Sequence, residues 1–165
     1  MSTRLTLLCA VLISASMAAR AQATVRVEPT HLDGPRPLQA ETREAVIRDY
    51  LQSWRSLRAA LGQNRADLLN ANFVGVAKDR LAATIRQQAN LGIRTLYRDR
   101  SHDIEVVFYS PDGSAIELSD TAEYDMQVAV HDKMQATQTV RSRYLVLLTP
   151  SEVRWRVRVF QAETE

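Results

Sequence analysis

The sequence predicts an α+β fold in which N-terminal helices pack on a four-stranded antiparallel sheet. Between residues 39 and 91, apolar residues recur at spacings of three and four, which is typical of amphipathic helices. Between residues 102 and 160, apolar and polar residues alternate, which is the period of half-buried strands. Because the helices precede the strands, we expect them to gather on one face of the sheet.

Length and composition indicate an ordinary soluble protein. The 165 residues allow one domain with a hydrophobic core, and contents of 45% hydrophobic and 24% charged residues are typical of globular proteins. The formal net charge is +2, and loss of Arg4 and Arg20 with an N-terminal leader leaves 21 − 2 = 19 basic residues against 19 acidic ones. This balance gives no indication of a nucleic-acid partner.

Residues 1–23 have the pattern of a secretory signal peptide. Arg4 supplies the positive charge, Leu5–Met17 is an apolar run too short to span a bilayer, and Ala21-Gln22-Ala23 is a small-x-small cleavage pattern. The alternative, a first helix of the domain itself, is disfavoured because the apolar residues occupy all sides. We therefore expect a periplasmic or secreted protein.

The single cysteine, Cys9, lies inside this apolar run. Leucine precedes it, where a lipoprotein cleavage site needs a small residue, so we expect no lipid and no stable membrane anchor. A mature chain without cysteine has neither a disulfide nor a catalytic thiol.

Residues 24–38 are predicted to form a tether before a domain that covers residues 39–163. The segment is rich in residues that break regular structure, namely Pro29, Gly34, Pro35 and Pro37. Val25 and Val27 leave open a short additional edge strand.

Three helices are predicted. The first runs from Gln39 to Leu61, is ended by Gly62, and has one broad apolar stripe formed by Val46, Ile47, Tyr50, Leu51, Trp54, Leu57 and Leu61. The second is short, begins at Asn64 as its N-cap and is ended by Gly75. The third runs from about Lys78 to Leu91, with an inward face formed by Leu81, Ile85 and Ala89.

Two hairpins are predicted to form the sheet. In the first, the turn Pro111-Asp112-Gly113 joins a strand at 102–109 to a long strand at 116–128, which places Phe108 beside Ile116, Val106 beside Leu118 and Ile104 beside Asp120. In the second, the turn Thr149–Glu152 joins strands at 140–148 and 153–159, with Leu148 opposite Val153, Val146 opposite Trp155 and Tyr144 opposite Val157. Between the hairpins, the same alternation places Tyr124 opposite Tyr144 and Asp125 opposite Arg143.

The order of elements and the segments RYLVLL (143–148) and VRWRVRVF (153–160) resemble the nuclear transport factor 2-like superfamily over Gln39–Gln161. The resemblance implies a strongly bent sheet that forms a cone with the helices, and an open-faced ligand site between them. The superfamily includes ketosteroid isomerase, polyketide cyclases, dehydratases and many non-catalytic binding or dimerising domains, so the fold alone does not assign a function. A cystatin-like helix on a sheet is the alternative, and the second and third helices count against it.

Asp120 and His102 are the candidate catalytic residues if the protein is an enzyme. Asp120 interrupts an apolar strand face, and a buried carboxylate must be paired, hydrated or protonated. His102 lies on the same face, diagonal to Asp120, and a His–Asp pair can carry out acid–base chemistry with help from Tyr50 or Tyr144. The alternatives are a β-bulge at Ser119-Asp120 that turns the carboxylate outward, and a solvated histidine at a strand end.

The inward-facing aromatic residues are the candidate ligand-binding residues: Tyr50, Trp54, Tyr124, Tyr144 and Trp155. They are expected either to line a pocket for a small apolar ligand or simply to form the core, where Trp54 and Trp155 would be anchors. A row formed by Arg143, Arg156 and Arg158 is expected either to bind an anion or to be a solvated outer face. His31 and His131 lie outside the strands, so no metal site is predicted, and no nucleotide or phosphate motif indicates a cofactor.

Two functions remain open. The favoured one is an exported, non-catalytic binding domain for a small apolar ligand or a protein partner. The other is an isomerase, dehydratase or cyclase that acts on a hydrophobic substrate. A homodimer through the outer sheet face is also expected, because Leu145 and Leu147 point outward there beside Val107 and Tyr109. The alternative is a monomer whose leucines are covered by arginine stems.

Overall fold

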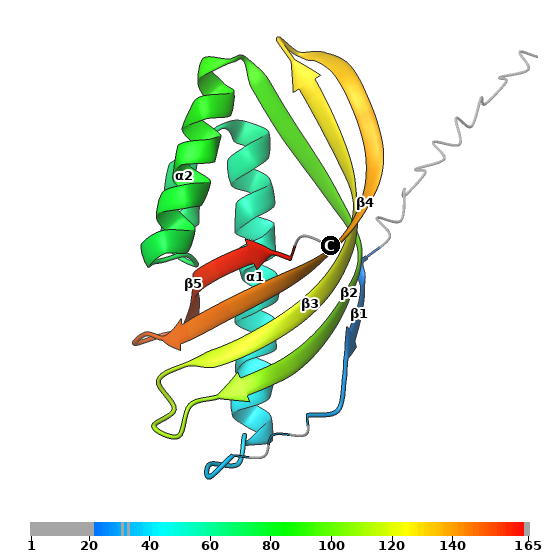
Figure 1. The fold of residues 1–165 in the computed structure, drawn as a ribbon. Coiled ribbons are helices and arrows are strands. Elements are labelled where there is room, and N and C mark those ends of the chain that lie inside the picture. Colours follow the sequence, from blue (N-terminus) through cyan, green and yellow to red (C-terminus); the bar gives the residue numbers. More distant parts are fainter. Residues whose placement is uncertain (1–21, 31, 33, 164–165) are drawn as a thin grey trace, which may run out of the picture.

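The structure, a computed structural model, describes residues 22–30, 32 and 34–163. Apart from Gln22 and Ala23, the predicted signal peptide lies outside the described residues. Helices α1 (Ala40–Gln63) and α2 (Gly75–Asn90) pack on one face of a mixed sheet that is not closed (Figure 1). The sheet has the order β1-β2-β3-β4-β5, formed by β1 (Thr24–Val27), β2 (Ile93–Tyr109), β3 (Ile116–Val130), β4 (Lys133–Pro150) and β5 (Trp155–Ala162). The predicted α+β class is confirmed.

The four predicted antiparallel strands are present as β2–β5, but the sheet is not four-stranded, because β1 adds a fifth strand that runs parallel to β2. Its register runs from Thr24 beside Ser101 to Val27 beside Ile104, and the backbone N–H of Glu28 donates to the carbonyl of Ile104 over 2.9 Å. The edge strand that Val25 and Val27 left open is therefore present. Across residues 22–30, 32 and 34–163, no helix has the length and apolar character needed to cross a membrane.

Helix α1 is the element on which the interior is built. Its inward stripe buries Val46, Tyr50, Trp54, Leu57 and Leu61, as predicted from the spacing. Gly62 does not end the helix. The helix ends at Gln63, and the next residue, Asn64, adopts the left-handed conformation at φ 54° and donates its backbone N–H to the carbonyl of Ala60. Asparagine tolerates this conformation better than most residues, so Asn64 is a C-cap and not the predicted N-cap.

The predicted second helix is only a 3₁₀ turn, η1 (Ala66–Leu69). Gly75 does not break a helix but begins α2, three residues before the predicted start. This earlier start goes with a different inward face, formed by Ala77, Ala82, Ile85 and Gln88. Leu81 is therefore only half-buried and Ala89 is exposed, whereas the burial of Ile85 is confirmed.

The pairing of β2 with β3 follows the prediction until Val106. Ile104 pairs with Asp120 and Val106 with Leu118, as expected. A register shift then follows, so that Phe108 pairs with Glu117 instead of Ile116. Because one extra residue reverses which side chains face the core, Phe108 lies on the outer face and is 46% exposed.

The predicted pairings of β4 are wrong on both of its sides. His131 and Asp132, at φ 47° and 64°, form the tight connection between β3 and β4, so β4 begins at Lys133 and not at Val140. The pairs are consequently Tyr124 with Val140 and Asp125 with Thr139. On the other side, the turn lies at Ser151–Arg154, Val153 is 79% exposed, and the pairs are Leu148 with Val157, Val146 with Phe160 and Tyr144 with Ala162.

Candidate functional site

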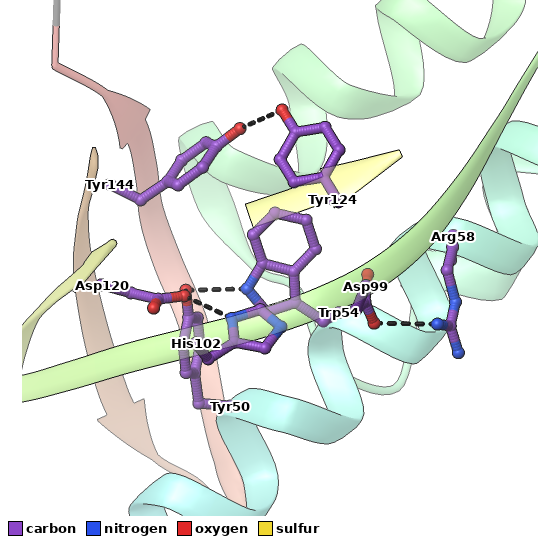
Figure 2. Close-up of polar contacts among 8 residues, drawn as sticks. All are labelled: Tyr50, Trp54, Arg58, Asp99, His102, Asp120, Tyr124 and Tyr144. Atoms are coloured by element: carbon purple, nitrogen blue, oxygen red, sulfur yellow. Dashed lines mark hydrogen bonds and ion pairs between the residues drawn. The ribbon is translucent and has the colours of Figure 1, made fainter. Parts of the chain in front are cut away.

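Four buried polar side chains form one hydrogen-bonded chain between α1 and the sheet (Figure 2). The hydroxyl of Tyr50 donates to Asp120 Oδ2 over 2.7 Å, and His102 Nδ1 lies 2.8 Å from the same oxygen. The indole Nε1–H of Trp54 donates to the Tyr50 hydroxyl over 2.8 Å. Asp120 is 0% exposed and His102 is 2% exposed. Both candidate catalytic residues therefore lie together, away from solvent.

The secondary structure explains this arrangement. Tyr50 and Trp54 are four residues apart on α1, so they lie on the same face of the helix and can bond to each other. His102 pairs with Ala122, and Ile104 pairs with Asp120, so the histidine and the carboxylate are diagonal neighbours on the inner sheet face. The diagonal position was predicted. The alternatives of an outward carboxylate and a solvated histidine are wrong.

The two carboxylate oxygens of Asp120 differ in their surroundings, because Oδ2 has two hydrogen-bond partners, Tyr50 and His102. Among the described residues, Asp120 Oδ1 is buried without a hydrogen-bond partner, which is unfavourable for a charged oxygen. Burial, and next the charge of Asp120, raise the pKa of the Tyr50 hydroxyl well above its ordinary value. Tyr50 thus stays protonated at neutral pH and acts as a hydrogen-bond donor to the carboxylate.

The predicted ligand-binding aromatics pack on one another. The Trp54 ring centroid lies 5.2 Å from that of His102, 5.3 Å from that of Tyr144 and 5.8 Å from that of Tyr124. The hydroxyls of Tyr124 and Tyr144 are hydrogen-bonded at 2.8 Å. These distances are typical of a packed aromatic cluster. The indole of Trp54 therefore occupies the space that a ligand in contact with Tyr124, Tyr144 and His102 would need.

Two further aromatic residues complete this cluster. Phe160 stacks on Tyr144 at 4.8 Å and lies 5.4 Å from Trp54, while Tyr97 lies 4.9 Å from Tyr124. Sequence reasoning did not assign either residue to the site, because Phe160 requires the correct β4–β5 register and Tyr97 lies before the predicted start of β2. Burial raises the pKa of Tyr97 to about 12 and is the main cause of the raised pKa values of Tyr124 and Tyr144. These hydroxyls are therefore protonated and can only exchange hydrogen bonds at neutral pH.

Trp155 is separate from this cluster and is half-buried. Its backbone N–H donates to Asp49 Oδ2 over 2.9 Å, and Asp49 Oδ1 accepts from Arg48 Nε over 3.2 Å. Asp49, which the helical pattern does not single out, thus joins α1 to the start of β5. The Trp155 side chain packs against the core but is only half-buried, so it is not the fully buried anchor that was predicted.

The predicted arginine row does not form. Arg156 donates to the carbonyls of Asn70 and Phe73, on the side of the helices. Arg143 bonds to Ser119 Oγ at 2.8 Å and pairs with Glu163 at 3.1 Å. Asp125 pairs with Arg100 instead of Arg143. A partly buried ion pair, Arg58 with Asp99 at 2.8 Å, is visible in Figure 2.

The described residues line several cavities, and one of about 330 Å³ lies beside Arg58 and Tyr97. Two larger ones also lie outside the hydrogen-bonded chain. One, of about 670 Å³, separates β1 from α1 and is lined by apolar side chains such as Val27, Ile47 and Leu51. The other, of about 1160 Å³, lies on the outer face at the end of β5. Neither is lined by Asp120 or His102. In the part of the chain that the structure describes, no three His, Cys, Asp or Glu side chains gather as a metal site would require.

Comparison with solved structures assigns the fold. The sequence matches no protein-family model and no curated protein. The structure is similar to the intermembrane space region of the chloroplast protein ARC6, with a TM-score of 0.63 and 15% identity, over 79% of this chain and 100% of that one. It is also similar to a putative scytalone dehydratase from Novosphingobium aromaticivorans, with a TM-score of 0.53 and 12% identity, over 76% of this chain and 89% of that one.

A third match is Aln2 from a Streptomyces species, with a TM-score of 0.51 and 14% identity, over 78% of this chain and 94% of that one. Identities this low carry information about the fold but not about the function. The resemblance stated from the sequence is confirmed at that level: the chain has the fold of the nuclear transport factor 2-like proteins.

Proposed function

We propose that this protein is an exported, non-catalytic domain that acts by binding another protein. The observation that carries the proposal is the position of Trp54, whose indole fills the centre of the predicted cone. Its N–H is used by Tyr50, and its ring packs against His102 and Tyr144. A substrate would reach Asp120 only if this indole moved away, at a cost comparable to unpacking a core residue.

The same packing argues against a small apolar ligand in the interior. Pockets that bind such ligands keep an unfilled volume with a few free polar groups. Here the hydroxyls of Tyr124 and Tyr144 bond to each other, and that of Tyr50 donates to Asp120. The groups that remain available for recognition are on the surface, which favours a protein partner.

A fluorescent apolar probe tests whether the interior is closed. We expect 1-anilinonaphthalene-8-sulfonate to give no saturable fluorescence rise with the unmutated protein, and a saturable rise with Trp54→Ala, which opens the interior. Leu51→Asp is the matched control, because Leu51 lines the cavity between β1 and α1. Saturable binding to the unmutated protein that Leu51→Asp leaves intact would place the probe in the interior and contradict the proposal.

The second candidate function is acid–base catalysis, and one observation favours it. Tyr50 and His102 lie 2.7 and 2.8 Å from the same oxygen of Asp120, and Asp120 Oδ1 has no partner among the described residues. An isomerase, dehydratase or cyclase would use such a carboxylate as a base. This function requires an open conformation of Trp54, so saturable probe binding to the interior of the unmutated protein would favour it.

The outer sheet face is the surface that we propose for a homodimer. Phe108 pairs with Glu117, Glu117 with Leu147, and Leu147 with Val159, so one row across four strands carries three apolar side chains. The bulge that turns Phe108 outward also places Tyr109 beside the buried Ile116 and against the core, so Tyr109 does not lie on the outer face as predicted. Phe108 is 46% exposed, and Leu147 and Val159 are half-buried. A row of partly exposed apolar side chains on an outer sheet face is typical of interfaces. Arg156 is held on the helix side, since its guanidinium donates to the carbonyls of Asn70 and Phe73.

Sedimentation of the mature domain at micromolar concentration tests this interface. We expect the mass of a dimer for the unmutated protein and of a monomer for Leu147→Asp, because a carboxylate in the centre of the row would be buried without a partner. Val153→Asp is the control, since Val153 is equally apolar but lies in the β4–β5 turn. A monomer mass for the unmutated protein, or a dimer that survives Leu147→Asp, would rule out this face.

Export is supported by the position of β1, which begins at Thr24, directly after the predicted cleavage site. We expect mass spectrometry of periplasmic or secreted protein to find Thr24 at or near the N-terminus. A chain that begins at Met1 and remains in the cytoplasm would contradict this localisation.

A further inference from the structure

Strand β4 is much longer than its neighbour β5. The β4–β5 pairing ends at Tyr144 beside Ala162, with one further bond from the Glu163 N–H to the Arg143 carbonyl. Before that point, Lys133–Ser142 pairs with β3 on one side and, among the described residues, with no strand on the other. Figure 1 shows this part of β4 continuing past the end of β5. We call Lys133–Ser142 the free edge of β4.

The free edge has the features of a strand that accepts a further strand. A register shift at Gln135 interrupts its ladder with β3, and from Ala136 to Leu147 the ladder is regular. Natural proteins usually protect such edges because unpaired N–H and C=O groups bind other chains. Met134 is 52% exposed on this edge. The cavity of about 1160 Å³ lies where β5 ends and is lined by Thr121, Arg141, Ser142 and Arg143 together with the end of β5.

The direction of the backbone groups follows from one hydrogen bond. Because the Arg143 carbonyl accepts from Glu163, the backbone groups of Arg143 point toward the β5 side. Backbone groups alternate in direction along a strand. The N–H and C=O groups of Arg141, Thr139 and Thr137 therefore point to the free edge, in line with β5.

The charges of this segment indicate the chemistry of the partner. From Lys133 to Arg143, the charged side chains are Lys133, Arg141 and Arg143, and all are cations. Arg143 pairs with Glu163, whereas neither Lys133 nor Arg141 forms an ion pair with any residue that the structure describes. A second copy is disfavoured, because antiparallel pairing about Gln138 would place Lys133 opposite Arg143.

We propose that the free edge of β4 binds an extended, acidic segment of a partner protein, which adds to the sheet as a strand in line with β5. Carboxylates of that segment lie opposite Arg141 and within reach of Lys133 at the far end of the edge, and apolar side chains lie opposite Val140 on the other face. This inference rests on the proposed function, because it names the kind of partner that a protein-binding domain of this shape would take.

Fluorescence anisotropy with two labelled peptides tests the proposal. In one peptide glutamate and valine alternate, and in the other lysine and valine alternate. We expect the mature protein to bind the glutamate peptide at least about tenfold more tightly, since opposite charges across strands stabilise pairing and like charges oppose it. The double variant Lys133→Glu with Arg141→Glu should reverse this preference.

A proline variant tests whether the backbone edge is used. Thr137→Pro removes an edge-facing N–H and leaves the hydrogen bonds to β3 intact. It should therefore lower the affinity for the glutamate peptide by about tenfold or more. Thr137→Ala keeps that N–H and should bind like the unmutated protein, and circular dichroism should show both variants folded. Absent binding of the glutamate peptide, equal binding of both peptides, or no effect of Thr137→Pro would each overturn the proposal.

These outcomes are separable from the proposed function. If the peptide does not bind, the proposals of a closed interior and of an outer-face dimer are unaffected. Those two proposals are tested by the apolar probe and by sedimentation. If Leu147→Asp remains dimeric and Thr137→Pro makes it monomeric, the occupant of the free edge is a second copy, and the acidic partner is wrong.

Discussion

Replacing Trp54 with alanine is expected to lower the free energy of unfolding by about 3–5 kcal/mol, the usual cost of deleting a large buried aromatic side chain. Trp54 is 2% exposed and packs against four rings, from His102, Tyr124, Tyr144 and Phe160. Its removal leaves a cavity among residues of β2, β3, β4 and β5. It also leaves the Tyr50 hydroxyl without the indole donor.

Chemical denaturation followed by far-ultraviolet circular dichroism measures this loss. Trp155→Ala is the matched control, because it deletes the same side chain at a half-buried position and leaves the backbone bond to Asp49 in place. We expect Trp155→Ala to lower the free energy of unfolding clearly less than Trp54→Ala does. A loss below about 1 kcal/mol for Trp54→Ala, or equal losses for the two variants, would mean that Trp54 does not fill the interior.

Replacing Asp120 with alanine is expected to be similarly costly, by about 3–5 kcal/mol, because breaking a buried pair leaves its partner without compensation. The Tyr50 hydroxyl and the His102 Nδ1 both use Asp120 Oδ2, and neither can reach water at their present burial. Asp120→Asn retains one acceptor oxygen in nearly the same shape, so a smaller loss is expected for it.

A double-mutant cycle separates the pair from general destabilisation. We expect the losses of Asp120→Ala and His102→Ala to be non-additive by about 1 kcal/mol or more, because each variant already removes their shared hydrogen bond. Additive losses, or a loss below about 1 kcal/mol for Asp120→Ala, would show that the two side chains are not coupled in solution.

The sequence predicted which residues come together in the candidate site, but not whether the site is open or filled. Asp120 and His102 could be placed on one sheet face, diagonal to each other, because side chains alternate with a fixed period along each strand. The same reasoning placed Tyr50 and Trp54 on the inward face of one helix. It could not decide whether these side chains line an open cavity or fill it, since that depends on the distance between helix and sheet.

The sequence by itself determined the α+β class, the inward stripe of α1 and the face to which most strand residues belong. These features follow from periods of 3.6 and 2 residues, which are local properties of the chain. A shift of a strand by two or four residues keeps every side chain on its face, so the period leaves the register open. Only the tertiary structure therefore decided that Leu148 lies beside Val157 and not Val153, a shift of four residues. Likewise, the bulge after Val106 and the pairing of β1 depend on contacts between segments far apart in the chain, and no local pattern specifies them.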